Sequence, residues 1–99
     1  MALVASGVAL QLLGRSEEEL AVYEDVVARF GNAPELGLRV HVAEALVCKG
    51  LTLGELRRTE EELAVYGDVV ARFGDAPEPE LRKQVASARS ELALTLEAP

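Results

Sequence analysis

The sequence predicts an all-α protein built from two similar helix pairs, and two observations lead to this prediction. The first is an internal repeat: in this 99-residue chain, residues 2–44 align with residues 45–87, with identical residues at 28 of the 43 positions. Periods between about 20 and 50 residues are typical of stacked repeat arrays. The second is hydrophobic spacing, because no segment shows the period of two that a half-buried strand requires. We expect one domain over residues 1–99, with repeat one at 2–44, repeat two at 45–87 and a partial capping helix at 88–99.

The residues that begin helices recur in both copies. Ser16 and Thr59 are typical N-cap residues, and Glu19 and Glu62 follow them by three positions. This spacing predicts a capping box, in which the hydroxyl accepts from the N3 amide and the carboxylate accepts from the N-cap amide. Gly14 precedes the first of these sites and is expected to lie in a turn. Together these positions predict five helices, at residues 2–13, 17–30, 36–56, 60–73 and 80–97.

The helix expected at 17–30 has one apolar stripe and a clear end. Leu20, Tyr23, Val27 and Phe30 follow helical spacing, and Val22 and Val26 widen the stripe. Gly31 is predicted to supply a left-handed residue at the C-terminus, with Pro34 just beyond it. The helix at 60–73 repeats this pattern and ends at Gly74 and Pro77, and Pro79 suits the first position of the last helix.

Charged residues near the expected helix ends have a simple interpretation. Residues 17–19 and 60–62 are glutamate triplets, which favourable interaction with a helix N-terminus explains. Arg29 and Arg72 fall in the expected last turns, where the helix dipole favours a cation. Neighbouring glutamates share one environment, so they are poor candidates for the two different pKa values that acid–base catalysis needs.

Composition narrows the classes of partner and location. Ten Lys and Arg against 17 Asp and Glu give a net charge of −7, so we expect no nucleic-acid partner. One cysteine cannot form an intramolecular disulfide, and we expect a cytoplasmic location. The apolar opening, residues 1–14, recurs at 45–57, so we interpret it as structural and not as a targeting signal. No run reaches the roughly 18 apolar residues of a membrane span, so no membrane partner is expected.

The placed helix pairs resemble the tetratricopeptide-repeat family. Gly7 and Gly50 match its small residue at the crossing of paired helices, and Gly14 matches its turn glycine. Tyr23 and Tyr66 match its aromatic position on the second helix. The resemblance implies a right-handed α-α superhelix of stacked helix-turn-helix repeats. The unit of 43 residues departs from the family's period of about 34 and also fits HEAT-like repeats, which remain the alternative.

The resemblance also implies a function. First helices of such repeats line a concave face that binds a peptide or protein, so the chain is expected to be a non-catalytic interaction module, an adaptor or scaffold. If the family's positions apply to this sequence, the residues that line the concave face are Val4, Val8, Gln11 and Leu12 in the first unit and Glu44, Val47, Leu51, Gly54 and Glu55 in the second. This set of residues is unusually apolar for a surface in contact with water, which is typical of a face that another molecule covers.

The ends of the array suggest an alternative function. Leu46, Val47 and Cys48 become Arg89, Ser90 and Glu91 at the matching places, giving the last helix a polar outer face. The helix expected at 2–13 has no such polar outer face, and about three units are usually needed for a stable array. A self-associating, homodimeric structural module is therefore the second hypothesis.

No arrangement of residues predicts an enzyme or a cofactor. His41 and Cys48 share one helix face, but two ligands do not make a metal site and the sequence contains no third His or Cys. No nucleophile triad, phosphate loop or paired-cysteine motif is present. We expect no catalytic residues, no cofactor and no metal.

Overall fold

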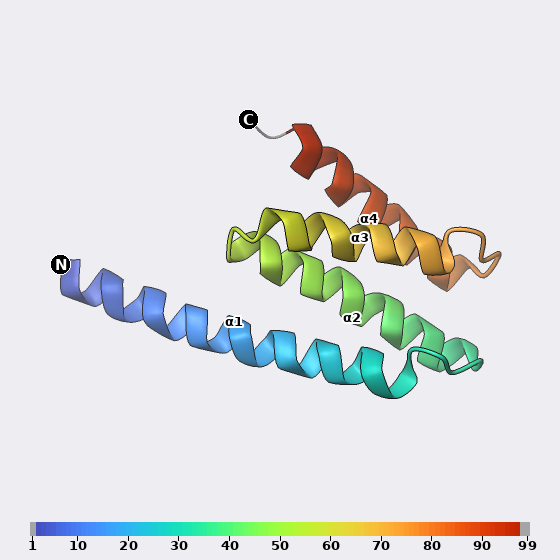
Figure 1. Cartoon of the computed structure of the whole chain (residues 1–99), viewed down its shortest axis with the longest axis horizontal. Helices are drawn as coiled ribbons and strands as arrows, with labels where there is room; N and C mark the ends of the chain where they lie inside the picture. Colours follow the sequence, from blue (N-terminus) through green and yellow to red (C-terminus); the bar gives the residue numbers. More distant parts are fainter. Residues whose placement is uncertain (1, 98–99) are drawn as a thin grey trace.

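The chain folds as a row of antiparallel helices. In the computed structural model, residues 2–97 form α1 (Ala2–Phe30), α2 (Leu36–Glu55), α3 (Thr59–Phe73) and α4 (Pro79–Glu97), and consecutive helices run in opposite directions (Figure 1). The structure describes the backbone of residues 2–97 and the side chains of residues 14–97. No strand occurs within residues 2–97, so the predicted all-α class is confirmed.

The prediction of five helices is wrong, because the first two form one helix. Residues 2–13 and 17–30 are joined through Gly14 into the 29-residue α1. Ser16 lies inside this helix with a buried side chain, so it caps nothing. A single glycine in a helix costs only about 1 kcal/mol relative to alanine. The helix-forming residues that follow Gly14, among them the glutamates at 17–19, offset that cost, and no proline interrupts the segment.

The turn between α2 and α3 also differs from the prediction. Thr59 is the first residue of α3, and the N-cap position belongs to Arg58, whose side chain makes no capping hydrogen bond. The turn is instead a Schellman motif at the end of α2, in which the Arg58 amide donates to Leu53 O and the Arg57 amide donates to Gly54 O. Arg57 has φ 61°, a left-handed conformation that favours glycine. The turn therefore depends on α2, not on a capping box.

The matching helical segments 17–30 and 60–73 end in the same way, but not as predicted. The amides of Gly31 and Gly74 donate to Val27 O and Val70 O, continuing the helical pattern by one residue. Gly74 is right-handed, and no glycine in the described part of the chain has positive φ. The left-handed C-terminal glycines are therefore a wrong prediction. Pro34 and Pro77 keep the helices from extending further, because a proline disfavours helical conformation in the residue before it, here Ala33 and Ala76.

The ends of the other helices follow the sequence closely. Pro79 is the first residue of α4, one residue before the predicted start, and α2 ends one residue before its predicted limit. Glu60, Glu61 and Glu62 form the first turn of α3 as predicted, whereas residues 17–19 lie far inside α1, where no helix N-terminus is present. Arg29 and Arg72 occupy last turns as predicted, and each pairs with an aspartate four residues earlier.

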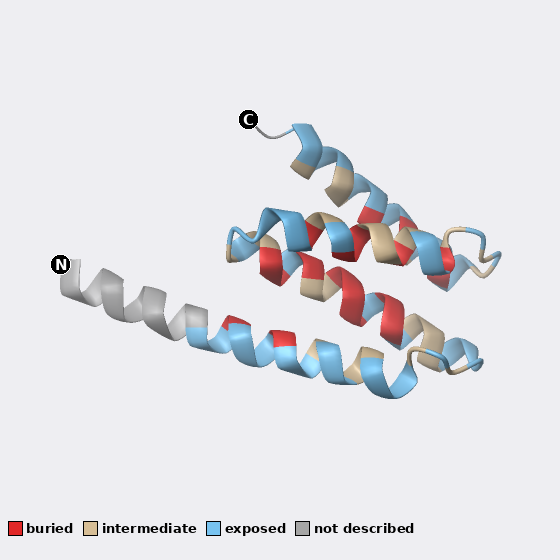
Figure 2. Cartoon of the chain, in the orientation of Figure 1, coloured by how far each residue is buried: buried red, intermediate tan, exposed pale blue. Residues whose placement is uncertain are grey.

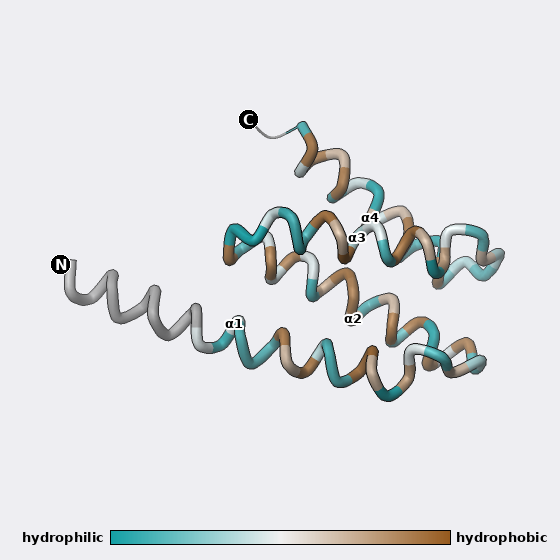
Figure 3. The backbone as a smooth tube through the Cα atoms, viewed as in Figure 1, coloured by the Kyte–Doolittle hydropathy of each residue, from teal (hydrophilic) through white to brown (hydrophobic). Residues whose placement is uncertain are grey.

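The hydrophobic core surrounds α2, which contacts α1, α3 and α4. Hydrophobic residues recur along the whole of α2 (Figure 3), and buried positions gather on α2 and α3, while the described part of α1 is mostly exposed (Figure 2). Leu20 is the largest contribution of α1 to the core among residues 14–30. Fully buried members of the core include Val42, Leu53, Tyr66, Val69 and Leu81.

Candidate interaction groove

An apolar groove lies between α1 and α2 and encloses about 410 Å³. Residues of α1 line one wall at positions i, i+1, i+4 and i+8, which share one helix face. Residues of α2 line the other wall with the same kind of spacing. We call the following residues the α1–α2 groove: Val22, Tyr23, Val26 and Phe30 of α1, with Leu38, His41, Glu44, Ala45 and Cys48 of α2.

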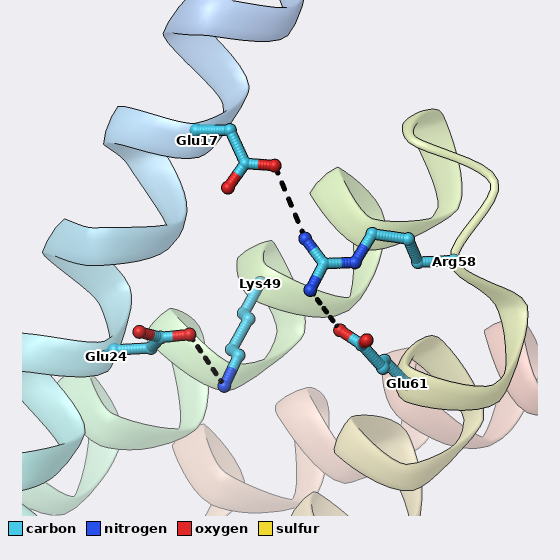
Figure 4. A network of polar contacts seen from close by, with 5 residues as sticks. All are labelled: Glu17, Glu24, Lys49, Arg58 and Glu61. Carbon is cyan, nitrogen blue, oxygen red and sulfur yellow. Dashed lines mark hydrogen bonds and ion pairs between the residues drawn. The ribbon is translucent and has the colours of Figure 1, made fainter.

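The position of α1 on α2 fixes the width of this groove. Leu20, on another face of α1, is buried in the core. Two ion pairs add to this contact (Figure 4): Lys49 Nζ lies 3.5 Å from Glu24 Oε1, and Arg58 Nη1 lies 3.4 Å from Glu17 Oε1. Arg58 also reaches α3, with its Nη2 2.6 Å from Glu61 Oε2. Most of these side chains are exposed to water and Lys49 is partly exposed, so the ion pairs contribute at most about 1 kcal/mol each. The packing of Leu20 and Val27 therefore carries most of the contact.

The same residues have very different exposure in the two copies of the repeat. Val22 and Val65 match by position, yet Val22 is 60% exposed and Val65 only 9%. Phe30 is exposed while its counterpart Phe73 is buried. Tyr23 is half-buried, whereas Tyr66 has no exposed surface. The α1–α2 groove is therefore a face that the second copy covers and the first copy leaves open.

Helix α2 covers the matching face of α3 and α4. The Cα of Gly50 lies against the Tyr66 ring, so a Cβ there would overlap with Cε1, Cζ and Cδ1. A Cβ at Gly54 would likewise overlap with the Glu62 carboxylate, although less closely. At the other end, the Arg39 guanidinium lies 5.8 Å from the centre of the Phe73 ring. The second copy thus shows what fills this kind of groove: a helix with small residues at its crossing points.

Burial raises the pKa of both tyrosine hydroxyls. For Tyr66, burial is the main cause, and the nearby carboxylate of Glu62 adds to it. For Tyr23, partial burial is again the main cause, with Cys48 and Glu19 as further causes. Both phenols are therefore neutral at physiological pH, and the α1–α2 groove presents a neutral, amphipathic ring to whatever enters it.

The structure places the predicted concave-face residues in different environments. Val47 lies in the hydrophobic core. Glu44 is exposed on the rim of the α1–α2 groove, and Leu51 and Glu55 are exposed further along α2. Gly54 is half-buried against α3. The remaining predicted positions, Val4, Val8, Gln11 and Leu12, lie outside the residues whose side chains are described.

The candidate chemical groups do not form a reactive cluster. His41 and Cys48 both line the α1–α2 groove, as their shared helix face predicts. Among the described side chains, no group of three or more His, Cys, Asp or Glu residues has an arrangement suited to a metal ion. The glutamates at 17–19 are all exposed along α1. The apolar surface is the most distinctive feature of the site.

Hydrophobic spacing identified the apolar stripe on residues 17–30 but not whether that stripe is exposed. Val22, Val26 and Phe30 fit equally well into a stripe that packs inward, because periodicity indicates a face and not what covers it. The available signal was the repeat itself. Residues 2–13, before the stripe of the first copy, match residues 45–56 of the helix that precedes the stripe of the second copy.

Comparisons with known proteins find no match among protein-family models, curated proteins or solved structures. In the part of the chain that the structure describes, no helix combines the length and hydrophobicity needed to cross a membrane.

Proposed function

We propose that the chain is a non-catalytic protein–protein interaction module whose α1–α2 groove receives an apolar helix. The observation that carries this proposal is the exposure of Val22, Tyr23 and Phe30 in an open groove, while the identical residues of the second copy are buried. Apolar grooves that accept the apolar face of a helix are a recurrent mode of protein recognition. Exposed apolar surface of this kind typically marks a site of interaction.

The chemistry of the groove favours a particular class of partner. Its walls are aliphatic and aromatic, and its polar groups are Glu44 and His41 at the α2 wall and the neutral hydroxyl of Tyr23. A helix with a small residue facing Tyr23 would match the contact that Gly50 makes with Tyr66. A nucleic acid is disfavoured by the net charge of −7.

The proposal extends to the architecture and location. A tetratricopeptide-like right-handed superhelix is supported by the close contact of Gly50 with Tyr66 at the α2–α3 crossing, where that family keeps a small residue. A HEAT-like array is the alternative. A cytoplasmic location is supported by the single cysteine, Cys48, since the fold needs no disulfide.

Selection of peptides from a random library against the full chain tests the proposed function. Val22→Glu places a charge in the groove at a position that is 60% exposed, so the free chain should fold unchanged. Leu94→Glu, at a similarly exposed position of α4, is the matched control. We expect selected peptides to be helical when bound and to lose at least tenfold in affinity to the Val22→Glu variant alone. Equal affinity for both variants would contradict a role for the groove.

A further inference from the structure

The second copy of the repeat identifies what should cover the groove of the first. Helix α2 lies across both α3 and α4. Its C-terminal half, residues 45–56, supplies Leu46 beside Val65 and Gly50 against Tyr66. The counterparts of these α3 residues are Val22 and Tyr23 of the open groove. The segment that matches residues 45–56 is residues 2–13.

The identities between these two segments coincide with burial. In the second copy, every position at which the two segments agree is buried or packed against the core. Most positions at which they differ, such as Cys48, Lys49, Leu51 and Glu55, are half-buried or exposed. The first segment has thus kept the residues that pack. The shared residues are Ala2, Leu3, Val4, Gly7, Leu10 and Leu13, matching Ala45, Leu46, Val47, Gly50, Leu53 and Leu56.

The route by which residues 2–13 reach a groove depends on Gly14. In the second copy the chain reverses at Arg57, which takes φ 61°. The matching residue, Gly14, lies within the continuous helix α1. A straight helix rises about 1.5 Å per residue along its axis, so residues 2–13 of this helix cannot lie beside residues 16–30 of the same helix. The segment therefore has to enter the groove of another molecule.

We propose that two copies of this chain associate through antiparallel α1 helices, with residues 2–13 of each copy in the α1–α2 groove of the other. The arrangement is an exchange of a terminal segment about a two-fold axis near Gly14, which gives a closed, self-complementary dimer. It rests on the proposed function of the groove and names its occupant. Gly7 of one copy then faces Tyr23 of the other, as Gly50 faces Tyr66 within one chain.

The same comparison predicts where the contact ends. Phe73 is covered by Arg39, from the N-terminal half of α2. Residues 2–13 contain no counterpart of Arg39, because they match only residues 45–56. In the proposed dimer, residues 2–13 therefore do not reach the end of the groove at Phe30.

Light scattering on the full chain over a hundredfold range of concentration tests the proposal. We expect a dimer. Val22→Glu in the groove and Leu3→Glu in the segment should each weaken association about a hundredfold or more, because each buries an unpaired carboxylate at both contacts. Leu94→Glu, at an exposed position of α4 outside the groove, should leave association within about threefold. Circular dichroism checks that each variant keeps its helical fold.

Mixing the two dissociated variants provides the sharper test. The Val22→Glu variant has an intact segment and the Leu3→Glu variant an intact groove, so one of the two contacts in a mixed pair is native. We expect the mixture to form heterodimers at concentrations where each variant alone is monomeric. A mixture that stays monomeric would overturn the exchange.

The Gly14→Ala variant distinguishes association of two copies from an alternative in which residues 2–13 fold back onto the groove of their own chain. Alanine stabilises a continuous helix but disfavours the left-handed turn that folding back would require. We expect this variant to dimerise at least as tightly as the original chain, and loss of the dimer would overturn the proposal. A wild-type monomer whose groove still binds selected peptides would refute the dimer and leave the proposed function standing. A dimer insensitive to Val22→Glu would refute the exchange, and the affinity of selected peptides for the same variant would then decide the proposed function.

Discussion

Gly50 lies against the Cδ1, Cε1 and Cζ atoms of the Tyr66 ring, at the crossing of α2 and α3, and has no room there for a Cβ. Tyr66 is the largest fully buried side chain among the described residues. The absence of a side chain at position 50 therefore sets how closely the two central helices approach. It also explains why the ring is fully covered, whereas the ring of Tyr23, without a comparable neighbour among the described residues, is only half-buried.

Gly50→Ala is expected to destabilise the fold. The new methyl group overlaps with the Tyr66 ring, and overpacking of this kind costs about 1–3 kcal/mol, against a gain of about 1 kcal/mol in helix propensity. We expect the free energy of unfolding in urea to fall by up to about 2 kcal/mol. Gly67→Ala, in α3 with nothing near its Cβ position, is the control and should stabilise by about 1 kcal/mol. Equal effects at both positions would show that the α2–α3 crossing is looser than described.

The sequence predicted the last three helices closely but not the first. Hydrophobic spacing together with the prolines located α2, α3 and α4 to within about one residue. At Gly14 the same local reasoning failed, although it placed the turn at Arg57 correctly. The residue best suited to a left-handed turn lies in a helix, and an arginine forms the turn. Packing decides this difference: the turn at Arg57 brings α3 back onto a complete α2, which no local propensity describes.

Replacing Arg57 tests how much strain that turn contains. Arg57→Gly should raise the free energy of unfolding by about 1 kcal/mol, because a left-handed conformation costs about this much for a residue with a Cβ. Arg57→Ala retains the Cβ and should change stability by less than about 0.5 kcal/mol. The difference between these two variants in urea unfolding isolates the backbone effect. If glycine were no better than alanine, the turn would not be strained at this position.

The candidate site was predicted less well than the fold, for a related reason. Patterning identified Val22, Val26 and Phe30 as apolar stripe residues, but the concave face carried over from the family included Val47, which is buried in the core. Exposure depends on which helices are neighbours. That information is present in the sequence only through the comparison of the two copies.

The ion pairs around Arg58 are expected to contribute little to stability. Arg58 lies between Glu17 of α1 and Glu61 of α3, and all three side chains are well exposed. Arg58→Gln should lower the free energy of unfolding by less than about 1 kcal/mol at low salt. The difference should nearly vanish at about 1 M NaCl, where screening acts within about 3 Å. Lys49→Gln, which removes the pair with Glu24, is the companion variant. A large loss that persists in high salt would mean that these contacts, and not Leu20, hold α1 on α2.

Alkaline pH should destabilise the fold through Tyr66. Its pKa is raised in the folded chain, chiefly by burial, while the unfolded chain titrates near the ordinary value of about 10. A group whose pKa is higher in the folded state contributes stability that is fully present below the unfolded pKa and is lost as the pH rises toward the folded pKa. We therefore expect the free energy of unfolding to decline above about pH 10.

Tyr66→Phe isolates this effect from the ionisation of other groups. The hydroxyl of Tyr66 is buried with no hydrogen-bond partner among the described side chains, so its removal should leave stability at pH 7 unchanged or raise it by about 1 kcal/mol. The variant should also show a shallower decline above about pH 10. Tyr23→Phe, at the half-buried matching position, should alter the alkaline decline less.

Phenolate absorbance near 295 nm in the same two variants checks the assignment to Tyr66. The Tyr66→Phe variant retains only Tyr23, which should ionise before the chain unfolds because its ring is only half-buried. The Tyr23→Phe variant retains only Tyr66, which should ionise only as the helices unfold, because the folded chain leaves its ring no exposed surface. Circular dichroism at each pH reports the remaining helix. Early ionisation of Tyr66 in a folded chain would contradict its burial under Gly50.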